Sequence, residues 1–186
     1  MTKQQFASKI LSPESLPAKL EQVRQKGRKI VLTQGSFDLV HIGHGRYLAE
    51  AKRHGDVLFV GVDSDEKVSH RKGPERPVVP EEERLEMLAY LESVDYVVLK
   101  KLSDPKWSLI KTIRPDVLIA TKKTYTPAQL KELEKYCGEV ISLEEQATTS
   151  TSAKIRRVQI GAATKITRTL SKKLITAIEE VLAELN

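Results

Sequence analysis

Apolar residues in this chain recur as short, nearly continuous runs separated by stretches with helical spacing. The apolar runs lie at residues 29–33, 57–62, 96–99, 116–120 and 139–143. Helical patterns lie at residues 18–25, 43–54, 80–91, 105–113 and 127–136. This alternation is typical of βαβ units that build a parallel sheet. We therefore predict an α/β fold with a doubly wound, Rossmann-like parallel sheet.

Local signals support several of these boundaries. Residues 57–62 are apolar almost throughout, as expected for a strand that is buried on both faces. Pro80 and the three glutamates after it are typical of the first turn of a helix. Residues 63–79 are polar and interrupted by glycine and proline, so we expect a loop there.

The sequence changes character near its end. A hydroxyl-rich run covers residues 147–152, and Gly161 is expected to break the segment that follows. Residues 167–185 carry an apolar stripe at helical spacing, which includes Leu170, Leu174 and Ile178. We expect a main domain over residues 1–160, with an N-terminal helical segment at 1–28, and an amphipathic C-terminal helix over 161–186.

Size and composition place the chain among ordinary globular proteins. Its 186 residues are enough for one domain with a modest appendage, and 40% of them are hydrophobic. No apolar run approaches the ~20 residues that span a bilayer, and no signal-peptide pattern is present. Cys137 is the single cysteine, which excludes an intrachain disulfide and a cysteine-rich zinc site. We expect a cytoplasmic protein without a membrane partner.

The net charge of +6 is unevenly distributed. From Lys154 to the end, seven basic residues face three glutamates, a local excess of +4. Such a bias suits nucleic acid, a polyphosphate ligand or a solvated helix face. The tail has no aromatic residue on which bases would stack, so we do not expect a nucleic-acid partner.

The largest cluster of candidate functional residues follows the first predicted strand. Gly35-Ser36-Phe37-Asp38 leads, after two residues, to His41-Ile42-Gly43-His44. In doubly wound sheets, ligands bind outside the carboxyl ends of the strands, and a helix N-terminus favours anions. Histidines three residues apart can both donate hydrogen bonds to phosphate oxygens there.

Two other interpretations of this motif are open. Histidines three apart also form half of a metal site, but no cysteine pair accompanies them, and we expect no protein-bound metal. Two surface histidines at a helix start would leave the preceding glycine turn and apolar strand without a purpose.

On these residues the chain resembles the cytidylyltransferase-like nucleotidyltransferases of the HIGH superfamily, whose signature is spelled literally at residues 41–44. The likeness covers roughly residues 29–155. It is closest to the nucleotidyltransferase domain of ADP-heptose synthase. The segments that carry this closer likeness are Val62-Asp63-Ser64-Asp65, Arg71-Lys72-Gly73, Arg76-Pro77-Val78, Glu83-Arg84, Pro115-Asp116-Val117-Leu118 and Tyr125 with Pro127. Glycerol-3-phosphate cytidylyltransferase and archaeal FAD synthase look similar at fewer of these points.

The resemblance implies roles for individual residues. His41, His44 and Lys72 would be catalytic. The nucleotide would be held by Ser36, Phe37, His41, Gly43, His44, Thr149, Ser150, Thr151 and Ser152. Asp38 would lie near the acceptor, although a role in bonding the amides of its own turn is an equal alternative.

Two departures from the family pattern bear on the substrate. Many relatives begin the hydroxyl-rich motif with arginine, where this chain has Glu145-Gln146-Ala147. ADP-heptose synthases have a Gly-Gly-Asp-Tyr stretch where this chain has residues 121–125, including Lys122 and Lys123. Two long cations at this point favour a more anionic acceptor, with Lys122 as a contact, or report lost activity.

The sequence thus predicts a nucleotidyltransferase that joins a nucleoside monophosphate, from ATP in preference to CTP, to a small phosphorylated sugar or polyol. Mg²⁺ would arrive with the nucleotide. Transfer from CTP to a phosphorylated alcohol and a non-catalytic nucleotide-sensing module are the alternatives. The apolar stripe of the last helix favours a homodimer.

Overall fold

The computed structural model describes residues 6–121, 124–144 and 151–184. The chain divides into two compact units, residues 1–148 and residues 149–186. We describe each unit by itself.

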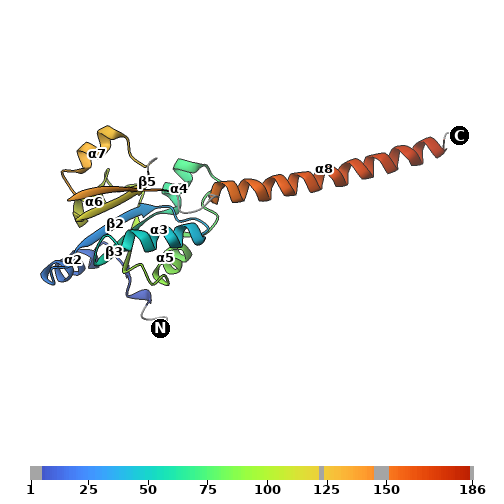
Figure 1. The fold of residues 1–186 in the computed structure, drawn as a ribbon. Coiled ribbons are helices and arrows are strands. Elements are labelled where there is room, and N and C mark those ends of the chain that lie inside the picture. Colours follow the sequence, from blue (N-terminus) through green and yellow to red (C-terminus); the bar gives the residue numbers. More distant parts are fainter. Residues whose placement is uncertain (1–5, 122–123, 145–150, 185–186) are drawn as a thin grey trace. The chain divides into compact units, whose positions relative to one another are not determined.

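The first unit is built on a parallel sheet whose strand order is β1-β4-β3-β2-β5-β6 (Figure 1). The strands are β1 (Ile10–Leu11), β2 (Ile30–Gly35), β3 (Val57–Asp63), β4 (Tyr96–Lys100), β5 (Val117–Thr121) and β6 (Glu139–Leu143). Every adjacent pair runs parallel, which confirms the predicted doubly wound α/β fold. The sequence pattern missed β1, because a two-residue strand shows no periodicity.

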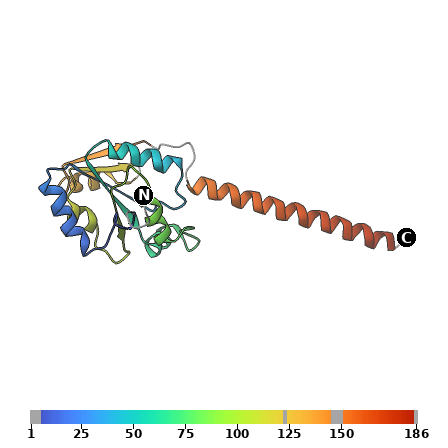
Figure 2. The same cartoon turned by 90° about the horizontal axis from the view of Figure 1, so that it is seen from below.

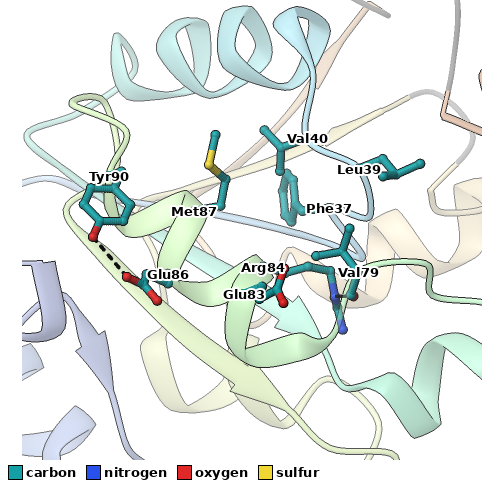
Figure 3. A pocket seen from close by; sticks show the side chains of 9 residues that line it. All are labelled: Phe37, Leu39, Val40, Val79, Glu83, Arg84, Glu86, Met87 and Tyr90. Atoms are coloured by element: carbon teal, nitrogen blue, oxygen red, sulfur yellow. Dashed lines mark hydrogen bonds between the residues drawn. The ribbon is translucent and has the colours of Figure 1, made fainter.

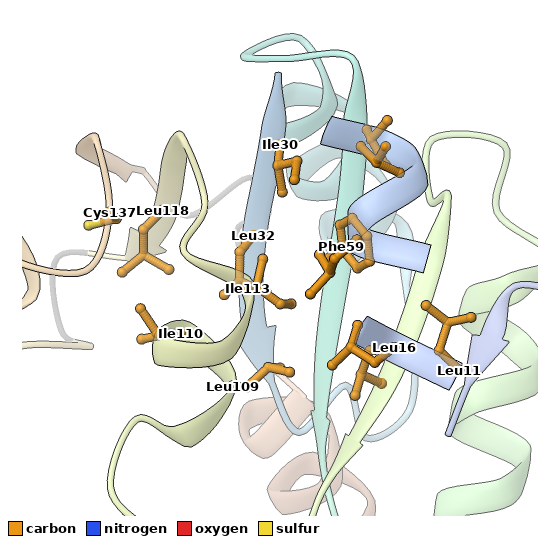
Figure 4. Close-up of a cluster of buried hydrophobic side chains, with 14 of the residues drawn as sticks. Leu11, Leu16, Ile30, Leu32, Phe59, Leu109, Ile110, Ile113, Leu118 and Cys137 are labelled. Carbon is orange, nitrogen blue, oxygen red and sulfur yellow. The ribbon is translucent and has the colours of Figure 1, made fainter. Parts of the chain in front are cut away.

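Helices cover both faces of this sheet (Figures 1 and 2). Because successive residues of a strand point to opposite faces, β2 sends Ile30 and Leu32 into one core and Val31 into the other. The helices α2 (Ser15–Gln25), α6 (Ser108–Ile113) and α7 (Pro127–Leu133) pack on the first core, part of which Figure 4 shows. The helices α3 (Ile42–Lys52) and α5 (Glu81–Ala89) pack on the second.

The helix α4 (Asp65–Lys72) lies within residues 63–79, so the prediction of a loop throughout that segment was wrong. Ser64 caps the helix by accepting a hydrogen bond from the amide of Lys67, and acidic residues begin it while basic residues end it. Val68 is the one residue of α4 that is fully buried. A helix with so little apolar surface has no stripe by which its sequence pattern reveals it.

The second unit contains the long helix α8 (Thr151–Glu184). This helix continues through Gly161, where we predicted a break, because one glycine costs a helix only about 1 kcal/mol relative to alanine. The unit begins before this helix, whereas the sequence pattern placed a boundary at residue 160. Within the described residues, no helix is both long and apolar enough to cross a lipid bilayer.

Candidate functional site

The sheet reverses its strand order between β2 and β5. The strands β3 and β4 lie on one side of this boundary and β6 on the other. A crevice at such a point, beyond the carboxyl ends of the strands, is the usual ligand site of an open α/β sheet. The chain leaves β2 at Gly35 and enters residues 36–41, which we name the HIGH loop. This loop ends at His41, the first residue of the histidine motif, and the other three residues of the motif begin α3. Lys122 directly follows β5, but its side chain lies outside the described residues.

The backbone of the HIGH loop is strained at two positions. Phe37 and Leu39 have φ angles of 48° and 51°, in the left-handed region that non-glycine residues rarely adopt. Packing offsets this cost at Phe37, whose side chain is buried and meets the His44 ring edge-on at 5.6 Å between centroids. The strained turn thereby fixes the direction in which the loop enters α3.

The two histidines form a reciprocal cap on α3. Nδ1 of His41 accepts a hydrogen bond from the amide of Gly43 at 3.1 Å, and Nδ1 of His44 accepts one from the amide of His41 at 3.3 Å. A nitrogen that accepts from an amide carries no proton, so each neutral ring holds its proton on Nε2. The ring centroids are 4.2 Å apart. The start of α3 therefore carries two neighbouring imidazole rings, and the proton of each lies on Nε2 when the ring is neutral.

Lys72 reaches the HIGH loop from the C-terminal end of α4. Its Nζ donates a hydrogen bond to the Ser36 hydroxyl at 2.8 Å. Desolvation of the ammonium group against the protein, together with repulsion from Arg71 and Arg76, lowers the pKa of Lys72 below its ordinary value. The structure thus brings together Lys72 and Ser36, which the sequence assigned separately to catalysis and to nucleotide binding.

Asp38 joins the HIGH loop to the chain after α4. Its carboxylate accepts hydrogen bonds from the amides of Val78 at 3.0 Å and Val79 at 3.1 Å, and it pairs with the Arg76 guanidinium at 2.6 Å. Burial by itself would raise the pKa of Asp38, but the two amides and Arg76 outweigh it and hold that pKa below its ordinary value. These amides belong to the chain after α4 and not to the turn of Asp38 itself, where the structural alternative placed its hydrogen bonds. The expected place of Asp38 near the acceptor stays a prediction.

Arg84 is a component of the site to which the sequence interpretation gave no role. Its side chain is 1% exposed and donates hydrogen bonds to the carbonyls of Ser36, Asp63 and Val79. It also pairs with the Asp65 carboxylate at 2.6 Å. The available signal was its place in α5 directly before the buried Leu85, on the face that packs against the sheet.

A second charged cluster lies at the ends of β3 and β4. Asp63 pairs with Lys100 and with Arg71, each at 2.9 Å. Burial alone would raise the pKa of Asp63, yet Lys100 and then Arg71 lower it below its ordinary value. The carboxylate is therefore ionised and balanced by cations beside the crevice.

Tyr125 extends the site beyond β5. Its hydroxyl accepts a hydrogen bond from the Gln34 side chain at 3.3 Å, and burial raises the pKa of Tyr125 to about 12. The phenol is thus neutral at physiological pH. Tyr125 belongs to the segment whose likeness to the family we noted, and the contact ties that segment to the end of β2.

An apolar pocket of about 410 Å³ lies behind the HIGH loop. Figure 3 shows Phe37 and Val40 of the loop, and Met87 and Tyr90 at α5, among its lining residues. Phe37 lines this pocket and also contacts the His44 ring, so the pocket adjoins the HIGH loop.

The hydroxyl-rich residues that the sequence assigns to nucleotide binding lie at the border of the described residues. Thr149 and Ser150 lie outside the described residues, as do the side chains of Thr151 and Ser152 at the start of α8. Their predicted contacts with phosphate stay predictions.

The described residues hold no group of three or more histidine, cysteine or acidic side chains that would bind a metal ion. The carboxylates of Asp38, Asp63 and Asp65 are each paired with a cation. This donor chemistry suits a Mg²⁺ ion held by phosphate oxygens and water, because Mg²⁺ needs few protein ligands.

The chain is similar to proteins of a known family. The Cytidylyltransferase-like family model matches residues 32–176. Bifunctional protein HldE of Syntrophotalea carbinolica is 41% identical over 157 residues, which cover 83% of this chain and 32% of that protein. Bifunctional protein HldE of Methylobacillus flagellatus is 42% identical over 155 residues, covering 82% and 31%. The chain thus spans about a third of the length of these relatives.

Two solved structures share the fold. A lipopolysaccharide core biosynthesis protein from Thermoplasma volcanium superposes with a TM-score of 0.54 and 27% identity, covering 67% of this chain and all of that chain. Pantoate-beta-alanine ligase from Francisella tularensis superposes with a TM-score of 0.53 over 77% of this chain and 68% of that chain. The second is 17% identical and therefore supports the fold alone.

Proposed function

The chain belongs to the cytidylyltransferase-like family of nucleotidyltransferases, and we propose that it transfers a nucleoside monophosphate, preferably from ATP, to a small phosphorylated sugar or polyol. The family match confirms the resemblance that the motifs indicated. The preference for ATP and a sugar rests on the likeness to HldE proteins, of which this chain covers a part.

The observation that carries this proposal is the pair of Nε2–H donors fixed by the cap of α3. In the proposed reaction, a phosphate oxygen of the acceptor attacks the α-phosphorus of the triphosphate. The bond between that phosphorus and the bridging oxygen to the β-phosphate breaks, and pyrophosphate leaves with the electron pair. An ionised acceptor phosphate needs no general base, so catalysis consists of positioning and charge stabilisation.

Each group of the site has a place in this scheme. His41 and His44 donate hydrogen bonds to the α-phosphate as its charge increases, and Lys72 supplies a positive charge beside Ser36. The family resemblance assigns residues 149–152 to the β- and γ-phosphates. Lys122 is expected to contact an anionic acceptor because a long cation departs here from the family's glycine-rich stretch. Asp38 anchors the loop. Mg²⁺ carried by the triphosphate neutralises part of the phosphate charge.

The experiment that tests this function measures pyrophosphate release with each of the common nucleoside triphosphates and a panel of phosphorylated sugars and polyols. We expect release with ATP and a phosphorylated sugar or polyol. Release with CTP and a phosphorylated alcohol would replace the proposed substrates by the cytidylyl alternative. Nucleotide binding by calorimetry without release from any acceptor would replace the proposed reaction by nucleotide sensing.

A matched pair of variants links turnover to the site. His44→Ala is expected to lower turnover by about 10²–10³-fold, the usual effect of removing one charge-stabilising donor. His54→Ala is the control, since His54 follows α3 at the end remote from the HIGH loop. Full activity of His44→Ala would refute the proposed role of that residue.

We propose in addition that α8 joins two copies of the chain. Large apolar side chains of this helix are exposed, with Leu170 at 56% and Leu174 at 61%. Burying such side chains contributes about 1.5–3 kcal/mol each. The cytoplasmic location and the absence of a nucleic-acid partner stay predictions from the sequence.

A further inference from the structure

Arg84 connects four segments of the chain through one buried guanidinium group. Its Nε donates to the carbonyl of Val79 at 2.9 Å, in the stretch before α5. Its Nη1 donates to the carbonyls of Ser36, in the HIGH loop, and of Asp63, at the end of β3. Its Nη2 pairs with Asp65 in the first turn of α4 at 2.6 Å. Figure 3 shows Arg84 beside Val79 behind the loop.

Two of these contacts fix the two partners of the Lys72–Ser36 hydrogen bond. Arg84 holds the backbone of Ser36, whose hydroxyl accepts from Lys72. Arg84 also holds Asp65, and the helix that begins there ends at Lys72. Because an α-helix is stiff over so short a length, fixing its first turn also fixes the position from which Lys72 extends.

We propose that Arg84 is a positioning residue for the transfer reaction, which holds Lys72 and the HIGH loop in their working arrangement. This inference rests on the proposed function for its effect on turnover. Arg84 does not touch the reacting atoms in this scheme, and it acts through Lys72 and Ser36.

The chemistry of the side chain explains why arginine suits this place. A guanidinium is planar and permanently charged, and its donors point in fixed directions toward several acceptors at once. Lysine keeps the charge but concentrates its donors on one nitrogen, which cannot reach four segments together. Arg84→Lys therefore keeps the positive charge and removes the directed donors that contact several segments at once.

The first test is a double-mutant cycle of turnover. We expect Arg84→Lys to lower kcat by about 10²-fold, the scale associated with misplacing a catalytic group by about 1 Å, while KM for the triphosphate changes less. In a Lys72→Ala background, the same substitution should cost less, because one of the groups that it misplaces is already absent and only its effect through the HIGH loop remains. An equal loss of kcat in both backgrounds, or full kcat in Arg84→Lys alone, would overturn the inference.

A control addresses general loss of stability. Asp95→Asn disrupts a partly buried ion pair with Lys52 and a hydrogen bond to the amide of Leu58, both remote from Arg84. Its thermal midpoint should fall while kcat at a temperature well below that midpoint is kept. If Asp95→Asn lowered kcat as much as Arg84→Lys, a purely structural role would explain both.

A second readout does not depend on turnover. The rate at which an amine-specific reagent modifies Lys72 is followed by mass spectrometry across pH. In the wild type, modification should begin at a lower pH than for an ordinary lysine, because desolvation against the loop and neighbouring cations depress its pKa. Arg84→Lys should move this profile toward the ordinary value, and an unchanged profile would overturn the inference.

This second readout also separates the two proposals. One outcome is that the wild type releases no pyrophosphate while Arg84→Lys still shifts the pH profile of Lys72 modification. That combination would refute the proposed function and keep the positioning role. If Arg84→Lys does not fold, Asp65→Asn replaces it, since the Asp65 side chain is 41% exposed and its loss weakens one Arg84 contact at the protein surface. The same loss of kcat and the same shift of the Lys72 profile are then expected.

Discussion

Nδ1 of His44 accepts the backbone N–H of His41 at 3.3 Å, so the first histidine of the motif orients the second. His41 in turn uses its own Nδ1 to cap Gly43. Each neutral ring therefore caps the helix with one nitrogen and carries its proton on the other. The same two side chains cap the helix and, in the proposed reaction, donate hydrogen bonds to phosphate. Suitable substitutions can separate capping from donation.

His41→Asn should separate capping from donation. Asparagine is among the best N-cap residues, so the thermal midpoint should change by no more than a few degrees. Its short amide does not reproduce the Nε2 donor, and turnover should fall by about 10²-fold or more. Thermal unfolding and pyrophosphate release on the same preparation check this. Retained turnover in His41→Asn would show that capping is the whole role of His41.

Asp38→Asn should destabilise the protein near neutral pH. Asp38 is 2% exposed and ion-paired with Arg76, and removing one partner of a buried pair costs about 3–5 kcal/mol. Because the pKa of Asp38 is lowered in the folded state, its stabilisation is present above the unfolded value of about 3.9 and is lost as pH falls through the folded value. Urea unfolding should show a difference in the free energy of unfolding between wild type and variant that is constant from pH 7 to about 5 and narrows as the pH falls below about 4. A gap independent of pH would contradict this account.

Lys72→Arg should change the alkaline limb of the pH profile of kcat. The lowered pKa of Lys72 means that its ammonium loses the proton below the ordinary 10.5. If kcat requires the charged form of Lys72, kcat declines as the pH rises through the lowered pKa of Lys72. Arginine stays charged throughout, so in Lys72→Arg the decline should move to higher pH, whatever the residual rate. An alkaline limb at the same pH in both proteins would assign it to another group.

Replacing Leu170 and Leu174 by glutamate should convert a dimer into a monomer in light scattering, if α8 joins two copies. Both side chains are exposed on this helix, and two charges there oppose apolar pairing. Arg168→Glu is the control, because it lies two residues before Leu170 and so on the opposite side of the helix. A wild type that is monomeric at micromolar concentration would contradict the proposed pairing.

The sheet was predictable because its strands carry strong local patterns. All seven residues of β3 are buried, and six residues that are almost all apolar, 57–62, indicate this strand in the sequence. The prediction failed where structure depends on something other than periodicity. The helix α4 is stabilised by its cap and its charges, and β1 exists through pairing with β4.

The site was predictable to the extent that a local motif encodes it. His41, His44 and Ser36 could be assigned to one candidate site because they adjoin a strand end in one short segment, and their roles stay predictions. Arg84 was missed because its partners, Ser36 and Asp63, lie 48 and 21 residues away along the chain. The sequence also could not predict the tautomers of His41 and His44. Which ring nitrogen carries the proton follows only from the hydrogen bonds that cap the helix.

The helix α4 is held at its first turn and carries Lys72 at its last, so it acts as an arm of about 12 Å. A tilt of about 5° around Asp65 would displace Lys72 by about 1 Å, a distance that matters to reaction rates. Val68, the buried residue of this helix, therefore bears on the position from which Lys72 extends, although its own side chain meets no reacting group in the proposed scheme. Proteins with the same motif can accordingly differ in speed through residues that never meet a substrate.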